Sequence, residues 1–332
     1  MTNGTRLGND GPSVFPLALG CMSMGSGGAY GARDDAEGIA TIQAAIERGV
    51  NLIDTGDFYG MGRNELLVAK ALQGRRDKAL LSVKFGAQRG PDGAFLGFDA
   101  SPAAVKTALA YSLVRLGVDH IDIYRPARLD PRVPIEETVG AIAGLVKAGY
   151  VRYISLSEIG VDTLRRAAKV HPICDVQLEY SLISRGPEAN LVPALAELGV
   201  AMTAYGVLSR GLLTGAKLGA GDNRAHMPRF AGANGEQNQA LAAALARIAA
   251  QKGVKPAQLA IAWVRAKGAA QGVTIVPTLG ARSREQLADA IAATDMSLAP
   301  AELAELEAAV PADAVAGTRY PAPMMATLDS ER

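Results

Sequence analysis

The chain has 332 residues, a formal net charge of +1 and no long run of a single charge sign. This balance excludes the strongly basic surface of a typical nucleic-acid-binding protein and gives no reason to expect binding to a membrane surface. Hydrophobic residues make up 49% of the chain and aromatic residues only 5%. A large apolar mass of Ala, Leu, Val and Ile favours parallel strands covered by helices.

The sequence also indicates the compartment. No apolar run approaches the roughly 20 residues of a membrane-spanning helix, and residues 1–6 lack the pattern of a signal peptide. The two cysteines, Cys21 and Cys174, do not make a disulfide framework. We therefore expect a cytoplasmic protein.

Short apolar runs alternate with longer amphipathic segments along the whole chain. Strands are predicted at 15–20, 51–55, 79–84, 121–124, 151–157, 175–178, 201–205 and 273–277. Helices are predicted at 34–49, 62–74, 101–117, 134–148, 161–169, 188–198, 255–268 and 283–293. Two of the helices have recognisable starts, since Ser101 precedes a proline and Ser283 opens a capping-box pattern. This alternation predicts an α/β protein with a single (β/α)₈ TIM-barrel domain over residues 1–332.

Additional segments follow particular strands. They are 25–33, 87–100, 208–235 and a tail at 311–332, with two further helices near 236–252 and 300–309. Loops that follow barrel strands lie on the catalytic face, so we expect long loops on the C-terminal face to build the pocket. Candidates for an apolar pocket wall are Tyr30, Phe95, Phe98, Phe230, Tyr320, Met324 and Met325.

Three groups with complementary chemistry lie where the second and third strands end. Asp54 and Tyr59 follow one strand, and Lys84 ends the next. Each residue alone has an ordinary interpretation, as a strand-end cap, a packing aromatic or a solvated charge. Together they predict catalysis, because a lysine held by a carboxylate lowers the pKa of a phenol that is otherwise about 10. Tyr59 is then the expected proton donor to a carbonyl oxygen.

The run from Ile53 to Glu65, IDTGDFYGMGRNE, resembles the signature of the aldo-keto reductase superfamily. Later strand ends resemble that family in the same order, including SLSE at 155–158, QLEYS at 177–181 and AYGVLSRGLLTG at 204–215. The final matching segment is IVPTLGAR at 275–282. The resemblance implies a nicotinamide-dependent enzyme that acts on a small carbonyl compound, without a metal. It also implies that Asp54, Tyr59 and Lys84 are three members of a catalytic tetrad.

The same resemblance implies which residues bind the cofactor. Ser157 and Gln177 match residues that hold the nicotinamide carboxamide, and Tyr205 matches the aromatic on which the ring stacks. The remaining matches cover the first strand end, the pyrophosphate loop and the adenosine phosphate site, namely Gly20, Met22, Gly206, Leu208, Arg210, Gly280, Arg282, Ser283 and Gln286. Arg282 has a planar fork of donors that suits a phosphate at a helix N-terminus. It favours NADPH, with NADH as the alternative.

Two positions depart from the family pattern. Ala127 stands where most members have the tetrad histidine, and His120, His171 and His226 do not match that position, so we expect them to be structural or exposed. Losing one donor to a developing oxyanion typically costs about 2.7–4 kcal/mol. The second departure is Asp-Ala at 289–290, where members often have Glu-Asn and an adenine contact.

The residues around Ala127 resemble a particular branch of the family. The run Pro-Ala-Arg at 126–128, followed by Asp-Pro at 130–131, is similar to its pyridoxal-reductase-like branch. This similarity favours a working enzyme, with pyridoxal-type aldehydes as candidate substrates. Arg125 and Arg128 are the candidates for assisting the reaction.

Two alternatives were weighed. A Rossmann fold is rejected because Tyr30 occupies the last glycine of a GxGxxG pattern that begins at Gly25. The second is a low-turnover, cofactor-binding barrel that resembles potassium-channel regulatory subunits, which the absence of the histidine allows. The intact set of Asp54, Tyr59 and Lys84 favours an enzyme. The sequence is compatible with a monomer and with an oligomer.

Overall fold

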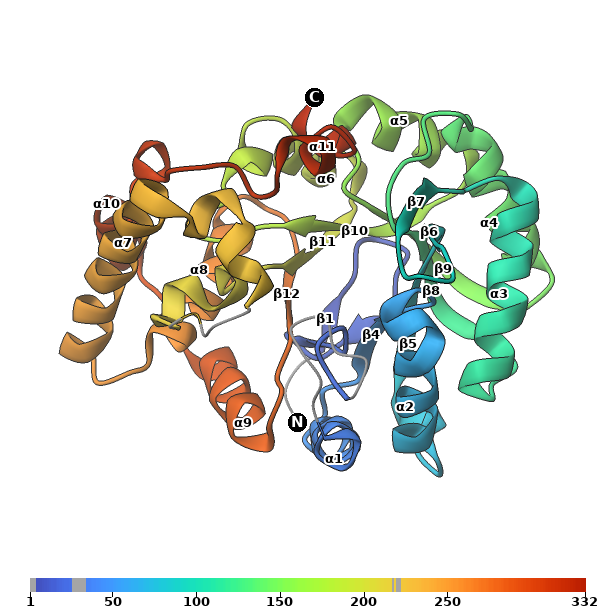
Figure 1. Cartoon of the computed structure of the whole chain (residues 1–332), viewed down its shortest axis with the longest axis horizontal. Coiled ribbons are helices and arrows are strands. Elements are labelled where there is room, and N and C mark those ends of the chain that lie inside the picture. The colour runs from blue at the N-terminus through green and yellow to red at the C-terminus, as the bar shows by residue number, and fades with distance from the viewer. Residues whose placement is uncertain (1–3, 26–33, 217, 219–221) are drawn as a thin grey trace.

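A computed structural model describes residues 4–25, 34–216, 218 and 222–332. Eight parallel strands form a closed barrel, and this confirms the predicted fold (Figure 1). In order around the barrel the strands are β10 (Ile173–Glu179), β11 (Ala201–Tyr205), β12 (Ile275–Leu279), β3 (Ala18–Gly20), β4 (Leu52–Gly56), β5 (Leu80–Phe85), β8 (Ile121–Pro126) and β9 (Val151–Ser157).

Each predicted strand has a counterpart, but β3 begins at Ala18 and not at 15, and β12 lies two residues further along the chain than predicted. This strand begins at Ile275 and not at 273. The amide of Val273 donates a 2.9 Å hydrogen bond to the carbonyl of Gly268, which belongs to the preceding helix. The valine therefore closes the end of that helix, although its apolar side chain fits a strand pattern equally well.

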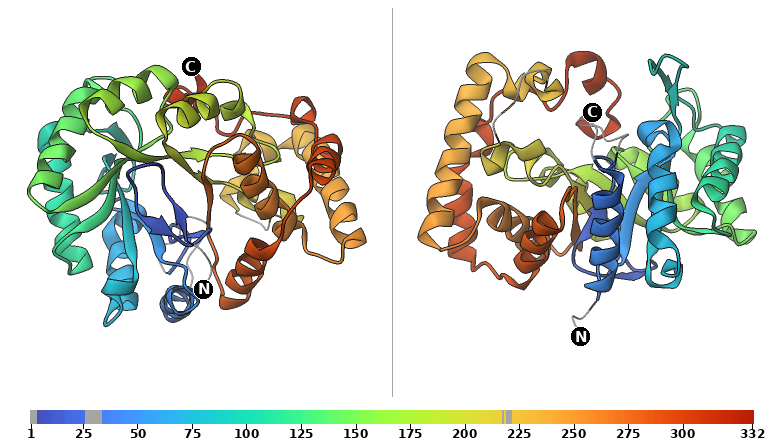
Figure 2. Two further views of the ribbon diagram at one scale, coloured as in Figure 1. Left: turned by 180° about the vertical axis from the view of Figure 1, so that it is seen from behind. Right: turned by 60° about the horizontal axis from the view of Figure 1, so that its bottom comes forward.

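Helices cover the outside of the barrel in both views of Figure 2. Those in the predicted positions are α1 (Asp35–Glu47), α2 (Arg63–Leu72), α3 (Pro102–Leu116), α4 (Ile135–Lys147), α5 (Val161–Val170), α6 (Leu191–Leu198), α8 (Pro256–Ala270) and α9 (Arg284–Ala292). Ser101 caps α3 as predicted, because its hydroxyl accepts a hydrogen bond from the amide of Ala104. At α9 only half of the capping box forms. The hydroxyl of Ser283 accepts a hydrogen bond from the amide of Gln286, but the side chain of Gln286 accepts from the amide of Arg282 and not from that of Ser283.

The predicted additions are also present. They are α7 (Gly232–Gln251) and α10 (Pro300–Ala309), and the segment predicted at 87–100 contains a hairpin of β6 (Ala87–Arg89) and β7 (Phe95–Phe98), which was not predicted. The tail forms the short helix α11 (Ala322–Met325), drawn in red in Figure 1. It ends beside the start of α5, where the amide of Gly160 donates a 2.7 Å hydrogen bond to Oδ2 of Asp329.

The hairpin near the N-terminus was not predicted either. Strands β1 (Thr5–Arg6) and β2 (Ser13–Val14) each have two residues, too few for a readable alternation. Leu7 and Val14 are buried in one cluster with residues from the first halves of the barrel strands, such as Leu52 and Cys174. The hairpin therefore closes the N-terminal end of the barrel and leaves the opposite end for the loops.

In the part of the chain that the structure describes, no helix is both long and apolar enough to cross a membrane. No group of three or more potential metal-ligating side chains occurs among these residues. Both cysteines are buried and carry free thiols.

Candidate active site

Asp54 and Lys84 form a buried ion pair at the C-terminal end of the barrel. They lie on the neighbouring strands β4 and β5, and Lys84 Nζ donates to Asp54 Oδ1. The other carboxylate oxygen accepts a 2.9 Å hydrogen bond from the hydroxyl of Ser82 and a 3.1 Å hydrogen bond from the amide of Gln177. Burial opposes the charge of Asp54, but Lys84 and Arg125 hold the pKa of its carboxyl below the usual value. Two of the three predicted catalytic residues, Asp54 and Lys84, are therefore in direct contact.

Tyr59 lies beside this pair. It begins a 3₁₀ turn, Tyr59–Gly62, directly after β4, and its ring centroid is 5.4 Å from Lys84 Nζ. A Cβ atom at Gly56 would lie 3.4 Å from both Tyr59 and Lys84, so glycine permits this close approach. Met61 has a φ of 54°, a left-handed conformation that is strained for a residue with a side chain. The predicted acid, phenol and amine therefore meet on one rim of the barrel.

The electrostatics of Tyr59 correct one expectation. We expected Lys84 to lower the pKa of the phenol, but burial and Asp54 together raise it well above its ordinary value. The principal opposing charges are those of Arg128 and Arg125. The reason is that Asp54 neutralises Lys84, whose own pKa is lowered by burial. Tyr59 therefore stays protonated at neutral pH.

Arg125 occupies the interior of the barrel beneath these groups. Its guanidinium is fully buried and donates to Asp175 Oδ2 at 3.2 Å, to Thr203 Oγ1 at 3.0 Å and to Ser82 Oγ at 2.6 Å. Sequence analysis did not assign Ser82, Asp175 or Thr203 to the site. Each of the three is a polar residue at an inward-facing position of an otherwise apolar strand, and this pattern could have indicated them. These partners hold Arg125 in place, with its Nη2 3.9 Å from Asp54 Oδ2.

The position of the expected histidine is filled by a small buried residue. Ala127 is 3% exposed, and its amide donates a 2.8 Å hydrogen bond to the carbonyl of Phe85. The side chain of His120 contacts Asp119 and Arg76 beside the start of β8, at the other end of the barrel. His171 bonds the carbonyl of Pro172 and His226 is exposed. None of the three histidines replaces the missing group.

The residues predicted to hold the nicotinamide lie at three adjacent strand ends. Ser157 is paired in register with Gln177, and Tyr205 is paired with Glu179. Gln177 points into the barrel, where its amide nitrogen donates to Asp54. Tyr205 is half-buried, with its hydroxyl directed at Glu158. One amide therefore links the proposed carboxamide site to the Asp54–Lys84 pair.

The structure contains a buried ion pair between Glu158 and Arg319 that was not predicted from the sequence. Arg319 donates two hydrogen bonds to the carboxylate, at 3.0 Å and 2.8 Å, and the hydroxyl of Tyr205 donates a third at 2.7 Å. Burial would raise the pKa of Glu158, but the guanidinium of Arg319 holds it at about 2. The tail that carries Arg319 has no hydrophobic periodicity in the sequence, so nothing pointed to this contact. The next residue, Tyr320, lies with its hydroxyl 3.2 Å from that of Tyr205.

The segment assigned to the pyrophosphate follows β11. Gly206 has a φ of 67°, and a Cβ atom there would lie 2.9 Å from Cγ of Glu179, so the position requires glycine. Leu208 and Arg210 lie where the chain enters the 3₁₀ turn Ser209–Thr214. Arg210 contacts Oε2 of Glu179 at 3.4 Å, with its guanidinium 4.6 Å from the ring centroid of Tyr320.

The segment assigned to the adenosine phosphate lies between β12 and α9. Gly280 precedes the helix, Arg282 and the cap residue Ser283 are half-buried, and Gln286 is exposed. Asp289, at the second departure from the family pattern, pairs with Lys255 at 2.7 Å, while Ala290 is buried. That departure therefore serves the contact between α8 and α9.

The remaining assigned positions lie near this segment. Gly20 ends β3, which pairs with β12, and Met22 follows it in a half-buried position. The expected pocket loop at 25–33, including Tyr30, falls outside the described residues except for Gly25. Phe95 and Phe98 stack edge to face at 5.0 Å within the β6–β7 hairpin.

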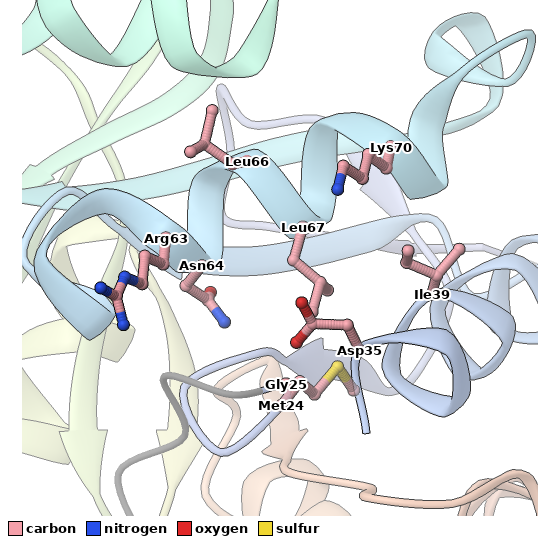
Figure 3. A pocket seen from close by; sticks show the side chains of 9 residues that line it. All are labelled: Met24, Gly25, Asp35, Ile39, Arg63, Asn64, Leu66, Leu67 and Lys70. Carbon is pink, nitrogen blue, oxygen red and sulfur yellow. The ribbon is translucent and has the colours of Figure 1, made fainter. Parts of the chain in front are cut away.

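A separate pocket of about 160 Å³ lies between the starts of α1 and α2 (Figure 3). Asp35 and Lys70 point into it from the two helices, and Asn64 lies at one end. The side chain of Asn64 accepts from the hydroxyl of Thr55 at 2.7 Å and donates to the carbonyl of Cys21 at 2.8 Å. Its lining includes neither Tyr59 nor the Asp54–Lys84 pair, so the pocket is distinct from the predicted catalytic groups.

Comparison with known proteins identifies the family. Residues 16–311 match the aldo/keto reductase family. A protein of Glycine max named probable aldo-keto reductase 1 is 40% identical over 326 residues, which cover 95% of this chain and 91% of that protein. The solved structure of glycerol dehydrogenase AKR11B4 from Gluconobacter oxydans is 26% identical, with a TM-score of 0.82 over 94% of this chain and 97% of that one. Aldo-keto reductase AKR11C1 from Bacillus halodurans, in its holo form, is 27% identical, with a TM-score of 0.76 and the same coverage.

The chain belongs to the aldo/keto reductase family. It is an NAD(P)H-dependent oxidoreductase of the class that acts on small carbonyl compounds. The alternative of a low-turnover barrel resembling channel subunits finds no support in these matches.

Proposed function

We propose that the protein reduces an aldehyde or ketone to the alcohol with NADPH, and that Tyr59 is the general acid. The contact that supports this proposal most directly is the buried Asp54–Lys84 pair, in which Lys84 Nζ lies 5.4 Å from the ring centroid of Tyr59. A neutral phenol beside a lysine whose positive charge is compensated by Asp54 can give up its proton only as negative charge develops on a neighbouring oxygen. Such charge develops on a carbonyl oxygen during reduction.

The residues around the barrel rim fit a nicotinamide cofactor. The ring of Tyr205 is only half-buried although its hydroxyl is fixed, and this suits an aromatic residue on which a nicotinamide would stack. In the described part of the chain, the buried hydroxyl of Thr278 has no hydrogen-bond partner, and it lies on β12 just before the assigned phosphate segment. Ser157 and Gln177 would hold the carboxamide, Gly206, Leu208 and Arg210 the pyrophosphate, and Gly280, Arg282, Ser283 and Gln286 the adenosine phosphate. When bound, the cofactor supplies the hydride for the carbonyl carbon.

Tyr59 then completes the reduction. As the carbonyl carbon gains the hydride, the O–H bond of Tyr59 breaks and its proton goes to the carbonyl oxygen, which yields the alcohol. Lys84 stabilises the phenolate that remains, because its charge lies close to the ring. Asp54 keeps Lys84 charged and oriented against the desolvation that lowers the pKa of the amine. Water returns the proton to Tyr59 before the next cycle.

Two finer assignments belong to the same proposal. Arg282 favours NADPH because a half-buried guanidinium at the start of α9 suits an additional phosphate, and NADH is the alternative cofactor. The resemblance of residues 126–131 to the pyridoxal-reductase-like branch makes pyridoxal the first candidate substrate. The similarity to a glycerol dehydrogenase adds glyceraldehyde and glycerol as further candidates.

The test is cofactor oxidation by the purified protein, with NADPH and NADH, against an aldehyde panel that includes pyridoxal and glyceraldehyde. Tyr59→Phe is the matched control, because it removes one hydroxyl and keeps the ring. We expect turnover that disappears in Tyr59→Phe while cofactor binding, measured by fluorescence titration, stays nearly unchanged. Equal turnover by both proteins would contradict the assignment of Tyr59 as the acid.

A further inference from the structure

Arg128 is a guanidinium at the mouth of the barrel that forms no salt bridge with the described residues. It follows β8 and is half-buried. Within the described part of the chain, no carboxylate forms a salt bridge with it. The residues outside that part, 1–3, 26–33, 217 and 219–221, include no aspartate or glutamate. By contrast, the other cations around the site are each paired, namely Lys84, Arg125, Arg210, Arg229 and Arg319.

The donor atoms of Arg128 are only partly used. Nη1 donates to the carbonyl of Ala127 at 2.6 Å and lies 3.5 Å from the hydroxyl of Ser157. With the residues that the structure describes, Nε and Nη2 form no hydrogen bond. A guanidinium presents five N–H groups in a rigid plane, and two donors on one edge match the two oxygens of an oxyanion. One such edge of Arg128 is available.

The position of this edge indicates which ligand it meets. Arg128 lies beside Ser157, with Nη1 3.5 Å from its hydroxyl, and its charge opposes the rise in the pKa of Tyr59. The residues assigned to the cofactor phosphates follow β11 and β12, which are separated from β8 by β9 and β10. An anion at Arg128 therefore arrives with the substrate and not with the phosphates of the cofactor.

Burial opposes the charge of Arg128, and the carboxylate that favours this charge, that of Glu158, is already paired with Arg319 and forms no salt bridge with Arg128. A charge withdrawn from water loses hydration free energy, and proteins normally compensate with a paired opposite charge. We propose that Arg128 binds an oxyanion group of the carbonyl substrate, a carboxylate or a phosphate, so that the enzyme selects negatively charged aldehydes or ketones over neutral ones. This inference rests on the proposed function and adds the substrate class to it.

The test uses matched pairs of substrates. One pair is 4-carboxybenzaldehyde and its methyl ester, and the other is pyridoxal 5′-phosphate and pyridoxal. The ester withdraws electrons more strongly, so a preference for the acid cannot come from intrinsic reactivity. We expect kcat/KM to be about tenfold higher for the anionic member of at least one pair, as for one charge-assisted contact. The pair that shows the preference identifies carboxylate or phosphate.

Variants of Arg128 then assign the preference. In Arg128→Met the ratio of kcat/KM values should fall to near one, mainly through a higher KM for the anionic member. Arg128→Lys should keep part of the ratio, because it retains the charge and loses the fork. Arg132→Met is the control, since Arg132 lies in the same loop, is 71% exposed at its side chain and pairs with Asp130. It should leave the ratio unchanged.

The outcomes separate this inference from the proposed function. Tyr59-dependent turnover of the neutral members tests the proposed function alone. A ratio near one in the native protein overturns the inference, as does an unchanged ratio in Arg128→Met with a native unfolding midpoint. If no member turns over, the proposed function fails. The Kd of 4-(hydroxymethyl)benzoate, measured for the native protein and for Arg128→Met, then decides whether the anion site exists. A higher Kd in the variant supports the site, and an equal Kd overturns it.

Discussion

The hydroxyl of Tyr205, at the end of β11, donates a 2.7 Å hydrogen bond to Oε1 of Glu158, directly after β9. The same carboxylate is held by Arg319, which lies 161 residues further along the chain. The C-terminal tail thus fixes the aromatic residue on which we propose that the nicotinamide stacks. Because Glu158 is fully buried, each of its partners is needed to offset the loss of hydration.

Arg319→Met should loosen the tail and weaken cofactor binding. Removing one partner of a buried ion pair typically costs about 3–5 kcal/mol, because the remaining charge is left uncompensated. We expect a lower unfolding midpoint, faster proteolysis within residues 311–332 and a higher Kd for the cofactor. Arg332→Met is the matched control, since Arg332 is exposed and its side chain donates to a backbone carbonyl, that of Ala326. A native cofactor Kd in Arg319→Met would show that Tyr205 does not depend on the tail.

The buried carboxylate of Glu158 predicts that the stability of the folded protein depends on pH. The pKa of Glu158 is lowered from 4.5 to about 2 in the folded protein. Its contribution is therefore fully present above pH 4.5 and is lost as the pH falls toward 2. Glu158→Gln should be less stable than the native protein at pH 6, with the difference shrinking toward pH 3. Chemical unfolding at several pH values measures this, and a constant difference would contradict it.

Asp57 should show the opposite dependence. Burial and the nearby Glu65 raise the pKa of its carboxyl to about 7, although Arg115 opposes the rise. The folded protein then binds the proton more tightly than the unfolded chain, so native stability falls as the pH rises from about 4 to 7. Asp57→Asn removes this loss and should stabilise the protein more at pH 8 than at pH 5. A tenfold change in proton affinity is about 1.4 kcal/mol, so we expect on the order of 2 kcal/mol for this half-buried group.

The outcome at Asp57 has a simple control. Asp92 lies in the exposed turn of the β6–β7 hairpin. Asp92→Asn should therefore show no comparable change in stability between pH 5 and pH 8. If the two variants behave alike, burial does not set the proton affinity of Asp57.

Within the central ion pair, Asp54→Asn should destabilise the protein more than Lys84→Met. Without Asp54, Lys84 is left with the repulsion of Arg125 and Arg128, which both lower the pKa of its amine. Without Lys84, the carboxylate of Asp54 still has Arg125 nearby and hydrogen bonds from Ser82 and Gln177. We expect about 3–5 kcal/mol for Asp54→Asn and less for Lys84→Met, by denaturant unfolding. The reverse order would mean that Arg125 does not compensate Asp54.

Ala127→His should not restore a faster enzyme. The position is 3% exposed, so an imidazole would overpack it at a cost of typically about 1–3 kcal/mol. We expect a lower unfolding midpoint and turnover no higher than that of the native protein. Ala127→Ser adds a single oxygen and is the control for packing. A stable Ala127→His variant with faster turnover would show that the native site lacks a donor there.

Much of the fold could be predicted from the sequence because its information is local. The eight strands were found from short apolar runs, and the start of α3 from the Ser101 cap. The meeting of Asp54 and Lys84 also followed, since parallel neighbouring strands bring their carboxyl ends to one rim. The hairpin at Thr5–Arg6 and Ser13–Val14 escaped because two-residue strands have no period to detect.

The sequence by itself therefore determined the barrel, the order of its strands and the three groups that share one rim. Only the tertiary structure decided how those groups are charged and what surrounds them. It showed that Arg125 is enclosed, whereas Nε and Nη2 of Arg128, three positions further along the chain, form no hydrogen bond with the described residues. It also joined Arg319 to Glu158 across 161 residues. The physical reason is that periodicity and caps are properties of neighbouring residues, whereas desolvation and ion pairing depend on which distant side chains fold around a charge.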